Sequence, residues 1–135
     1  LQKSEVSRST IDRLDHVVVH TNDPDGFVSL YRDKFGIKLS LDQTVEKWGG
    51  RMLFFRLNRT TIEVIGKIEK DGIPKDSFWG LAWSVSDLKA VHRRLTDVGV
   101  EVSNIRDGRK PRTIVCTVKS HTRGVPTLLI EHLDR

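Results

Sequence analysis

The sequence has one cysteine, Cys116, one methionine and one tyrosine among its 135 residues. A single cysteine cannot form an intrachain disulfide, and this sparing use of cysteine is consistent with a reducing compartment, so we expect a cytoplasmic protein. No apolar run approaches the roughly 18 residues of a membrane-spanning helix, so no membrane association is expected. A chain of this length can bury enough surface to fold without a disulfide or a structural metal.

Several catalytic motifs are also missing. The chain has no glycine-rich phosphate loop, no Gly-x-Ser-x-Gly turn and no Cys-x-x-Cys pair. The sequence therefore gives no support to a kinase, a nucleotide-dependent dehydrogenase or a serine hydrolase. Cys116 lies in a β-branched run with no paired histidine in the pattern, so we expect a buried structural thiol.

The chain has 23 basic and 18 acidic residues, which gives a net charge of +5. The basic residues are dispersed, and only the segment from Arg106 to Arg112 is locally dense. This segment can be a solvated loop, a contact for an anionic ligand or a nucleic-acid contact. Because no nucleic-acid-binding motif is visible, we expect no nucleic-acid partner, and the role of the segment stays open.

The first half predicts the order β-α-β-β-β. Residues 11–20 are rich in valine and predict a strand. Asp23-Pro24 is typical of a helix start, and Gly36 follows the last residue of an apolar helical face. Three further strands are expected over residues 37–46, 51–58 and 60–67.

The second half predicts the same order. A strand over 78–85 precedes a helix that we expect Ser86 to cap and Gly99 to end. Three strands are expected over 100–106, 112–118 and 126–133, with Asp107-Gly108 at the hairpin between the first two.

The repeated pattern predicts an α+β fold made of two βαβββ modules. Neither module alone would bury both faces of its sheet, so the two are expected to form one domain. The predicted boundaries are a tail at 1–10, a first module at 11–68, a linker at 69–77 and a second module at 78–135.

Four stretches carry a family resemblance. Asp15-His16-Val17-Val18-Val19 and Thr61-Ile62-Glu63-Val64-Ile65 resemble the outer strands of the first module of vicinal oxygen chelate proteins, the glyoxalase, bleomycin-resistance and extradiol-dioxygenase superfamily. The stretch Leu81 to Leu88 and the ending Gly124 to Glu131 resemble the second module. The resemblance covers roughly residues 12–133. The second half also resembles a glyoxalase-like branch of the superfamily.

The resemblance implies that the modules pair into a curved half-barrel sheet around a cavity, with the helices outside, in a homodimer. It implies that a metal, when present, is held by the outer strands of each module, at His16, Glu63, Gly80 and Glu131. Glycine has no ligating side chain, whereas the family usually has histidine there. His16, Glu63 and Glu131 are suitable ligands for a divalent ion such as Mn²⁺, Fe²⁺, Zn²⁺, Co²⁺ or Ni²⁺.

Strand alternation predicts which side chains share a face. His16 shares a face with His20, and Phe54 shares one with Arg56, which can clamp a ligand carboxylate. Gly80, Ala82 and Ser84 form a small-residue face that leaves room for a ligand. We therefore expect His20, Phe54, Arg56, Gly80, Ala82 and Ser84 to contact a substrate. For each polar residue an ordinary structural role is the competing interpretation.

Two functions remain open. The first is a metal-dependent lyase, isomerase or dioxygenase that uses Glu63 or Glu131 to move a proton while the ion stabilises an enolate or catecholate. The second is a metal-free protein that sequesters a small molecule, as bleomycin-resistance proteins do. Both act on a small organic ligand. Gly80 favours the second function, and the three potential ligands favour the first.

Overall fold

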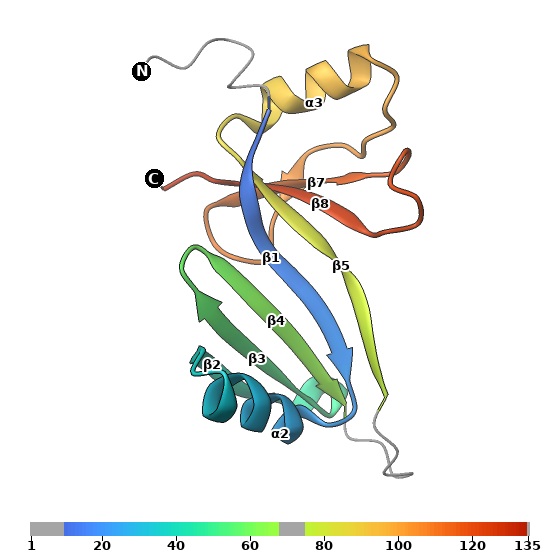
Figure 1. Cartoon of the computed structure of the whole chain (residues 1–135). Helices are drawn as coiled ribbons and strands as arrows, with labels where there is room; N and C mark the ends of the chain where they lie inside the picture. The colour runs from blue at the N-terminus through green and yellow to red at the C-terminus, as the bar shows by residue number, and fades with distance from the viewer. Residues whose placement is uncertain (1–9, 68–74, 135) are drawn as a thin grey trace. The chain divides into compact units, whose positions relative to one another are not determined.

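The computed structural model describes residues 10–67 and 75–134, and its elements repeat the predicted order twice (Figure 1). The first repeat consists of β1 (Ile11–Thr21), α2 (Pro24–Phe27) with the π-helix η1 (Val28–Lys34), β2 (Lys38–Val45), the 3₁₀ turn η2 (Glu46–Trp48), β3 (Gly50–Leu57) and β4 (Thr60–Lys67). The second consists of β5 (Asp76–Val85), α3 (Leu88–Asp97), β6 (Arg106–Asp107), β7 (Thr113–Val118) and β8 (Thr127–His132). The α+β fold is thereby confirmed. The predicted tail and most of the predicted linker lie outside the described residues.

The chain forms two compact units whose boundaries fall inside β1 and β5. One unit extends from His16 to Gly80, and we call it the first unit. The second unit combines the chain up to Asp15 with the chain from Leu81 onward. Among the described residues, no helix has the length and apolar character needed to span a membrane.

The sheet of the first unit has the strand order β2-β3-β4-β1. Strands β2, β3 and β4 are antiparallel neighbours, and β1 lies parallel to β4. Leu53, Phe55 and Val64 point to one face of this sheet and pack with Val28 of η1 into a core that is almost fully buried. Because strand side chains alternate, their neighbours in sequence point to the opposite face.

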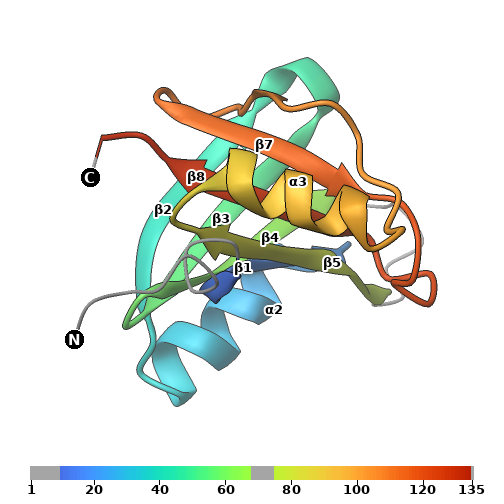
Figure 2. The same ribbon diagram turned by 90° about the horizontal axis from the view of Figure 1, so that it is seen from above.

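The sheet of the second unit has the strand order β5-β8-β7-β6, with β5 parallel to β8. Figure 2 shows α3 lying over these strands. The core between them consists of Val85, Leu88, Val91, Cys116 and Leu129, each at most 1% exposed. Cys116 is thus a buried thiol, as predicted.

Three local predictions need correction. The first helix is α-helical for only one turn and continues as a π-helix, in which Phe35 N–H donates to the carbonyl of Leu30. The ring of Tyr31 contacts the rings of both Phe27 and Phe35. The second helix is capped by Asp87, whose side chain accepts from Ala90 N–H, rather than by Ser86.

The strand predicted over 100–106 is reduced to β6 and one bridge from Val102 to Val118. Backbone bonds from Ser103 N–H to Thr117 and from Lys119 N–H to Glu101 pair this stretch with the neighbouring chain, and side-chain bonds supplement them. Ser103 Oγ accepts from Thr117 N–H at 2.8 Å, and Arg106 donates to both Ser103 and Thr117. Arg106 of the basic segment therefore has a structural role.

Candidate functional site

The candidate site residues of the first unit share one face of its sheet, the face without the helix. The register places His16, Val18 and His20 of β1 beside Thr61, Glu63 and Ile65 of β4. It also places Phe54 beside Glu63 and Arg56 beside Thr61. All of these alternate with residues of the helix-packed core. We call this face the helix-free face. It is formed by His16, Val18 and His20 of β1, Phe54 and Arg56 of β3, and Thr61, Glu63 and Ile65 of β4.

His16 and Glu63 form the most buried polar pair on the helix-free face. His16 Nε2 lies 3.8 Å from Glu63 Oε2, and the two side chains are 12% and 5% exposed. A carboxylate removed from water is costly unless hydrogen bonds or positive charge compensate it. The structure places the His16 imidazole beside this carboxylate. The structure brings these two predicted site residues together.

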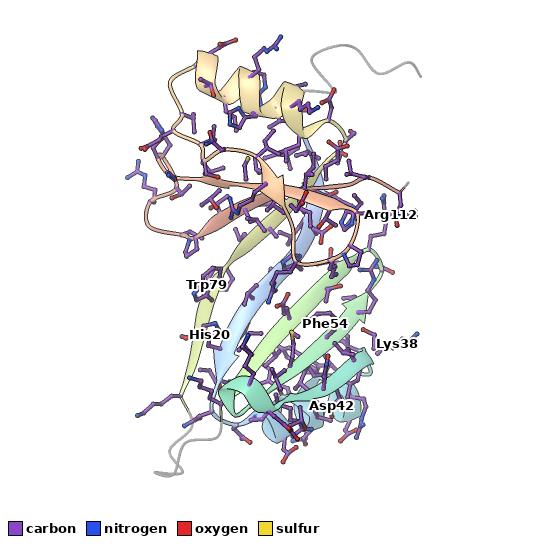
Figure 3. The ribbon with its side chains drawn as sticks, turned by 180° about the vertical axis from the view of Figure 1, so that it is seen from behind. His20, Lys38, Asp42, Phe54, Trp79 and Arg112 are labelled. Carbon is purple, nitrogen blue, oxygen red and sulfur yellow. The ribbon has the colours of Figure 1, made fainter. Side chains whose placement is uncertain are left out.

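The flanks of this face combine aromatic and basic groups. Arg56 donates to the Thr61 hydroxyl at 2.9 Å, which fixes the guanidinium along the sheet. At the other end of β1, the ring of His20 stacks on Trp79 of β5, with centroids 6.1 Å apart. Figure 3 shows these two rings on neighbouring strands and Phe54 on β3.

In the second unit the predicted alternation of β5 is confirmed. Trp83 and Val85 belong to the core under α3, so Ala82 and Ser84 point to the opposite face of the sheet. The register places them beside Leu128 and Ile130 of β8. Both small residues are almost fully buried. Gly80, which ends the first unit, is also buried, and it has no side chain that could bind a metal.

Glu131 has a different partner from the metal that the resemblance implied. It shares the face of Leu129, which is part of the core under α3. Its Oε1 accepts a hydrogen bond from Leu88 N–H, the first residue of α3, at 2.7 Å. The carboxylate therefore satisfies an otherwise unpaired donor and interacts favourably with the positive end of the helix dipole.

Comparing the two repeats explains this difference. Asp23 and Asp87 cap the helices of the two repeats. Val18 lies beside Glu63 in one repeat, and Ala82 lies beside Leu128 in the other. The counterpart of Glu63 is therefore Leu128, three residues before Glu131.

The counterpart of Glu131 is Gly66. A Cβ added to Gly66 would meet Pro24, the first residue of α2, at 2.9 Å, just as Glu131 meets the first residue of α3. The sequence match of Glu63 with Glu131 was wrong in register because both lie in similar apolar runs.

The donor set does not fit a metal centre with four protein ligands. The four related positions are His16, Glu63, Gly80 and Leu128, and only the first two have ligating side chains. Across residues 10–67 and 75–134, no three His, Cys, Asp or Glu side chains gather closely enough to hold an ion.

Two features were missed by sequence reasoning. Asp15, which is buried, accepts from His132 at 2.7 Å, and Arg13 lies 3.4 Å from the same carboxylate. Asp15 and His132 are 117 positions apart, so no spacing pattern could have joined them. The second feature is a pocket at the ends of β1 and β4, which is bordered by Lys67 and Lys75. The only available signal was the position of these lysines at strand ends.

Comparisons with known proteins agree with this fold. Residues 15–117 match the profile of the Glyoxalase/Bleomycin resistance protein/Dioxygenase superfamily. A search of curated proteins found no match. Solved structures with the same fold include methylmalonyl-CoA epimerase from Mycobacterium tuberculosis, at 24% identity and a TM-score of 0.66, with 90% of this chain and 88% of that chain covered.

A Streptomyces coelicolor methylmalonyl-CoA epimerase variant in complex with 2-nitronate-propionyl-CoA is 20% identical, with a TM-score of 0.66 and coverage of 90% and 98%. A hypothetical protein from Bacillus halodurans C-125 is 17% identical, with a TM-score of 0.69 and coverage of 91% and 96%. These identities support the fold alone. The profile match covers most of the sequence, and the chain therefore belongs to the Glyoxalase/Bleomycin resistance protein/Dioxygenase superfamily.

Proposed function

We propose that this chain is a small-molecule-binding protein of the superfamily that works without a four-ligand metal centre and sequesters its ligand on the helix-free face. The observation that carries the proposal is the set of side chains at the positions where relatives would hold a metal. Neither Gly80 nor Leu128 has a side-chain atom that can bind a metal, and Glu131 accepts a hydrogen bond from Leu88 N–H. A metal-dependent lyase, isomerase or dioxygenase would need an ion to polarise its substrate, and this set of side chains does not fit one.

The helix-free face has the composition of a ligand site. Sites for small molecules are mostly apolar with a few well-placed polar groups that fix orientation. Val18 and Phe54 supply apolar contact area here, while His16, Glu63 and Arg56 supply polar groups. The Glu63 carboxylate accepts hydrogen bonds, so it favours a ligand with a hydroxyl or amine at this point.

A proton-transfer enzyme is the second candidate. The buried pair of Glu63 and His16 favours it, because a carboxylate held out of water beside an imidazole can act as a general base. The epimerases among the similar structures act on CoA thioesters, so an isomerase acting on such an ester is the form to test. Its difficulty is that Arg56, the one arginine or lysine among the residues that define the helix-free face, already donates to Thr61.

The proposal is tested by titrating wild-type protein with methylmalonyl-CoA and with a panel of small aromatic molecules in a calorimeter. Glu63→Gln is the site variant, and Glu46→Gln, which changes an exposed carboxylate in η2, is the matched control. We expect a ligand whose affinity falls at least tenfold in Glu63→Gln and stays unchanged in Glu46→Gln. If every ligand found binds both variants equally, the helix-free face is not the site.

The same samples separate the two functions. Proton exchange at the carbon next to the thioester is followed in deuterated water by nuclear magnetic resonance. Binding without exchange supports sequestration. Exchange that depends on Glu63 supports the enzyme. The homodimer implied by family resemblance is a separate prediction, and light scattering coupled to size-exclusion chromatography tests it.

A further inference from the structure

The first unit has a pocket of about 330 Å³ at the end of the helix-free face. Its lining comes from the ends of β1 and β4 and from the start of the chain leading into β5. The lining residues are His20, Thr21, Asn22, Ile65, Lys67, Lys75 and Ser77. His20 and Ile65 are neighbours in the sheet register and belong to the helix-free face itself. The pocket therefore continues the proposed ligand site along β1.

The pocket has a fixed frame. The Thr21 hydroxyl donates to Asp76 at 2.6 Å and accepts from Asp23 N–H at 2.9 Å. Asn22 accepts from the backbone N–H of Lys75 at 2.7 Å. These bonds join the end of β1 to the start of β5. They hold the backbone of Lys75 at the pocket and engage the Asp76 carboxylate with Thr21.

Among the described residues that line the pocket, the charged side chains have one sign. Lys67 and Lys75 are both exposed at its border, and none of the seven is acidic. Two ammonium groups at one pocket favour a ligand with a carboxylate or phosphate group. The nearest acidic side chain in this frame is that of Asp76, which is bonded to Thr21.

The wall of the pocket suits a flat ring. The imidazole of His20 is nearly parallel to the indole of Trp79, at an interplanar angle of 18°, and Ile65 lies beside His20 in the sheet. A ring supported in this way offers a flat surface, and stacking against it favours aromatic ligands. Trp79 is a positioning residue here, because it acts through His20.

We propose that this pocket binds the anionic aromatic part of the ligand, with the ring against His20 and Ile65 and the negative group near Lys67 and Lys75. The inference rests on the proposed function and names the chemical class of its ligand. It predicts preference for an aromatic acid over the neutral aromatic alcohol and over an aliphatic acid.

The test is calorimetric titration of the whole chain with 2-naphthoate, 2-naphthalenemethanol, cyclohexanecarboxylate and adenosine 5′-monophosphate. We expect 2-naphthoate or the nucleotide to bind at least fivefold more tightly than the neutral alcohol and the aliphatic acid. The better of the two anions shows whether the negative group is a carboxylate or a phosphate. Binding should weaken as salt is added, because exposed charges are screened.

Variants connect this binding to the pocket. Lys67→Gln with Lys75→Gln should weaken binding of the preferred anion roughly tenfold, and His20→Ala about fivefold. The matched control is Lys34→Gln with Lys47→Gln, which removes two exposed charges from the same unit but outside the pocket. Trp79→Phe should restore the affinity that Trp79→Ala loses.

The outcomes separate this inference from the proposed function. If the control double variant loses as much affinity as the Lys67→Gln, Lys75→Gln double variant, the effect is one of general charge and the inference is overturned. Equal affinity for the acid and the alcohol would also overturn it. Either result leaves the Glu63→Gln test intact, because that test uses a different residue. Conversely, anion binding that needs the two lysines while no ligand responds to Glu63→Gln would support the pocket and contradict the proposed function.

Discussion

The hydrogen bond from Leu88 N–H to Glu131 gives a sharp prediction about stability. Replacing an N-terminal cap residue by alanine costs about 1 kcal/mol, and loss of a partly buried negative charge at a helix start adds about 0.5 to 1 kcal/mol. Glu131→Ala should therefore lower the free energy of unfolding by roughly 2 kcal/mol. Glu131→Gln keeps an accepting oxygen and should cost about half as much.

For a domain of this length, 1 kcal/mol corresponds to a change of about 4 °C in the melting temperature. We therefore expect Glu131→Ala to melt about 6 to 8 °C below the wild-type protein, and Glu131→Gln about 3 to 4 °C below it. Circular dichroism with thermal and urea unfolding measures both variants. Glu101→Ala, which changes an exposed residue of the same unit, is the control and should melt within about 1 °C of wild type.

The measurement is made in a chelating buffer, because this separates a helix cap from a metal ligand. A cap contributes its full stability without any ion. A metal ligand contributes only when the ion is bound. If Glu131→Ala matches wild type in the chelator and differs from it only after Mn²⁺ or Zn²⁺ is added, the assignment of Glu131 as a cap is refuted.

Two further predictions concern titrating groups. Burial raises the pKa of the Cys116 thiol, so the native protein should react with a thiol reagent at least a hundredfold more slowly than the unfolded chain; fast reaction in native buffer would show that the thiol is accessible. The hydrogen bond from Arg51 lowers the pKa of Asp42 below its ordinary value of 3.8. The bond therefore stabilises the fold fully above about pH 5, and this contribution is lost as the pH falls through the lowered pKa of the folded state. The stability difference between wild type and Asp42→Asn should be constant from pH 5 to 7 and shrink below pH 4, and a difference that grows in acid would contradict it. Because Asp42 is partly exposed, the difference should be below about 1 kcal/mol.

The element order was predictable because the chain marks its own boundaries. Asp23-Pro24 and Gly36 enclose the first helical segment, and the strands of the first repeat were placed within a residue or two of their observed ends. The π-helix was not predictable, because Phe27, Tyr31 and Phe35 have the same spacing that an α-helix would give. The short β6 was missed because Ser103 and Arg106 form side-chain bonds that no periodic pattern records.

The candidate site was predictable only where a strand face determines it. Alternation predicted that His16 shares a face with His20 and that Phe54 shares one with Arg56, and the register of β1, β3 and β4 brings these residues and Glu63 onto one face. Glu131 could not be placed in this way, because its assignment depended on matching two repeats of low similarity. The consecutive apolar residues Leu128, Leu129 and Ile130 fall on both faces of β8, so alternation alone did not show which face carries Glu131.

The pairing of Asp15 with His132 and the pocket near Lys67 depend on tertiary contacts. Asp15 meets a residue from the far end of the chain, and Lys75 reaches the pocket through a bond to Asn22. The pairing of Asp15 with His132 leaves no trace in local sequence, and the pocket leaves only the position of its lysines at strand ends. Such polar contacts between distant segments are where sequence reasoning fails for this chain.

We propose that the helix-free face binds a small molecule without a four-ligand metal centre. Elemental mass spectrometry tests this on protein purified without chelator and dialysed against metal-free buffer. We expect well below one divalent ion per chain, and the same value in His16→Ala and Glu63→Gln. Close to one divalent ion per chain, retained through dialysis and lost in both variants, would contradict it.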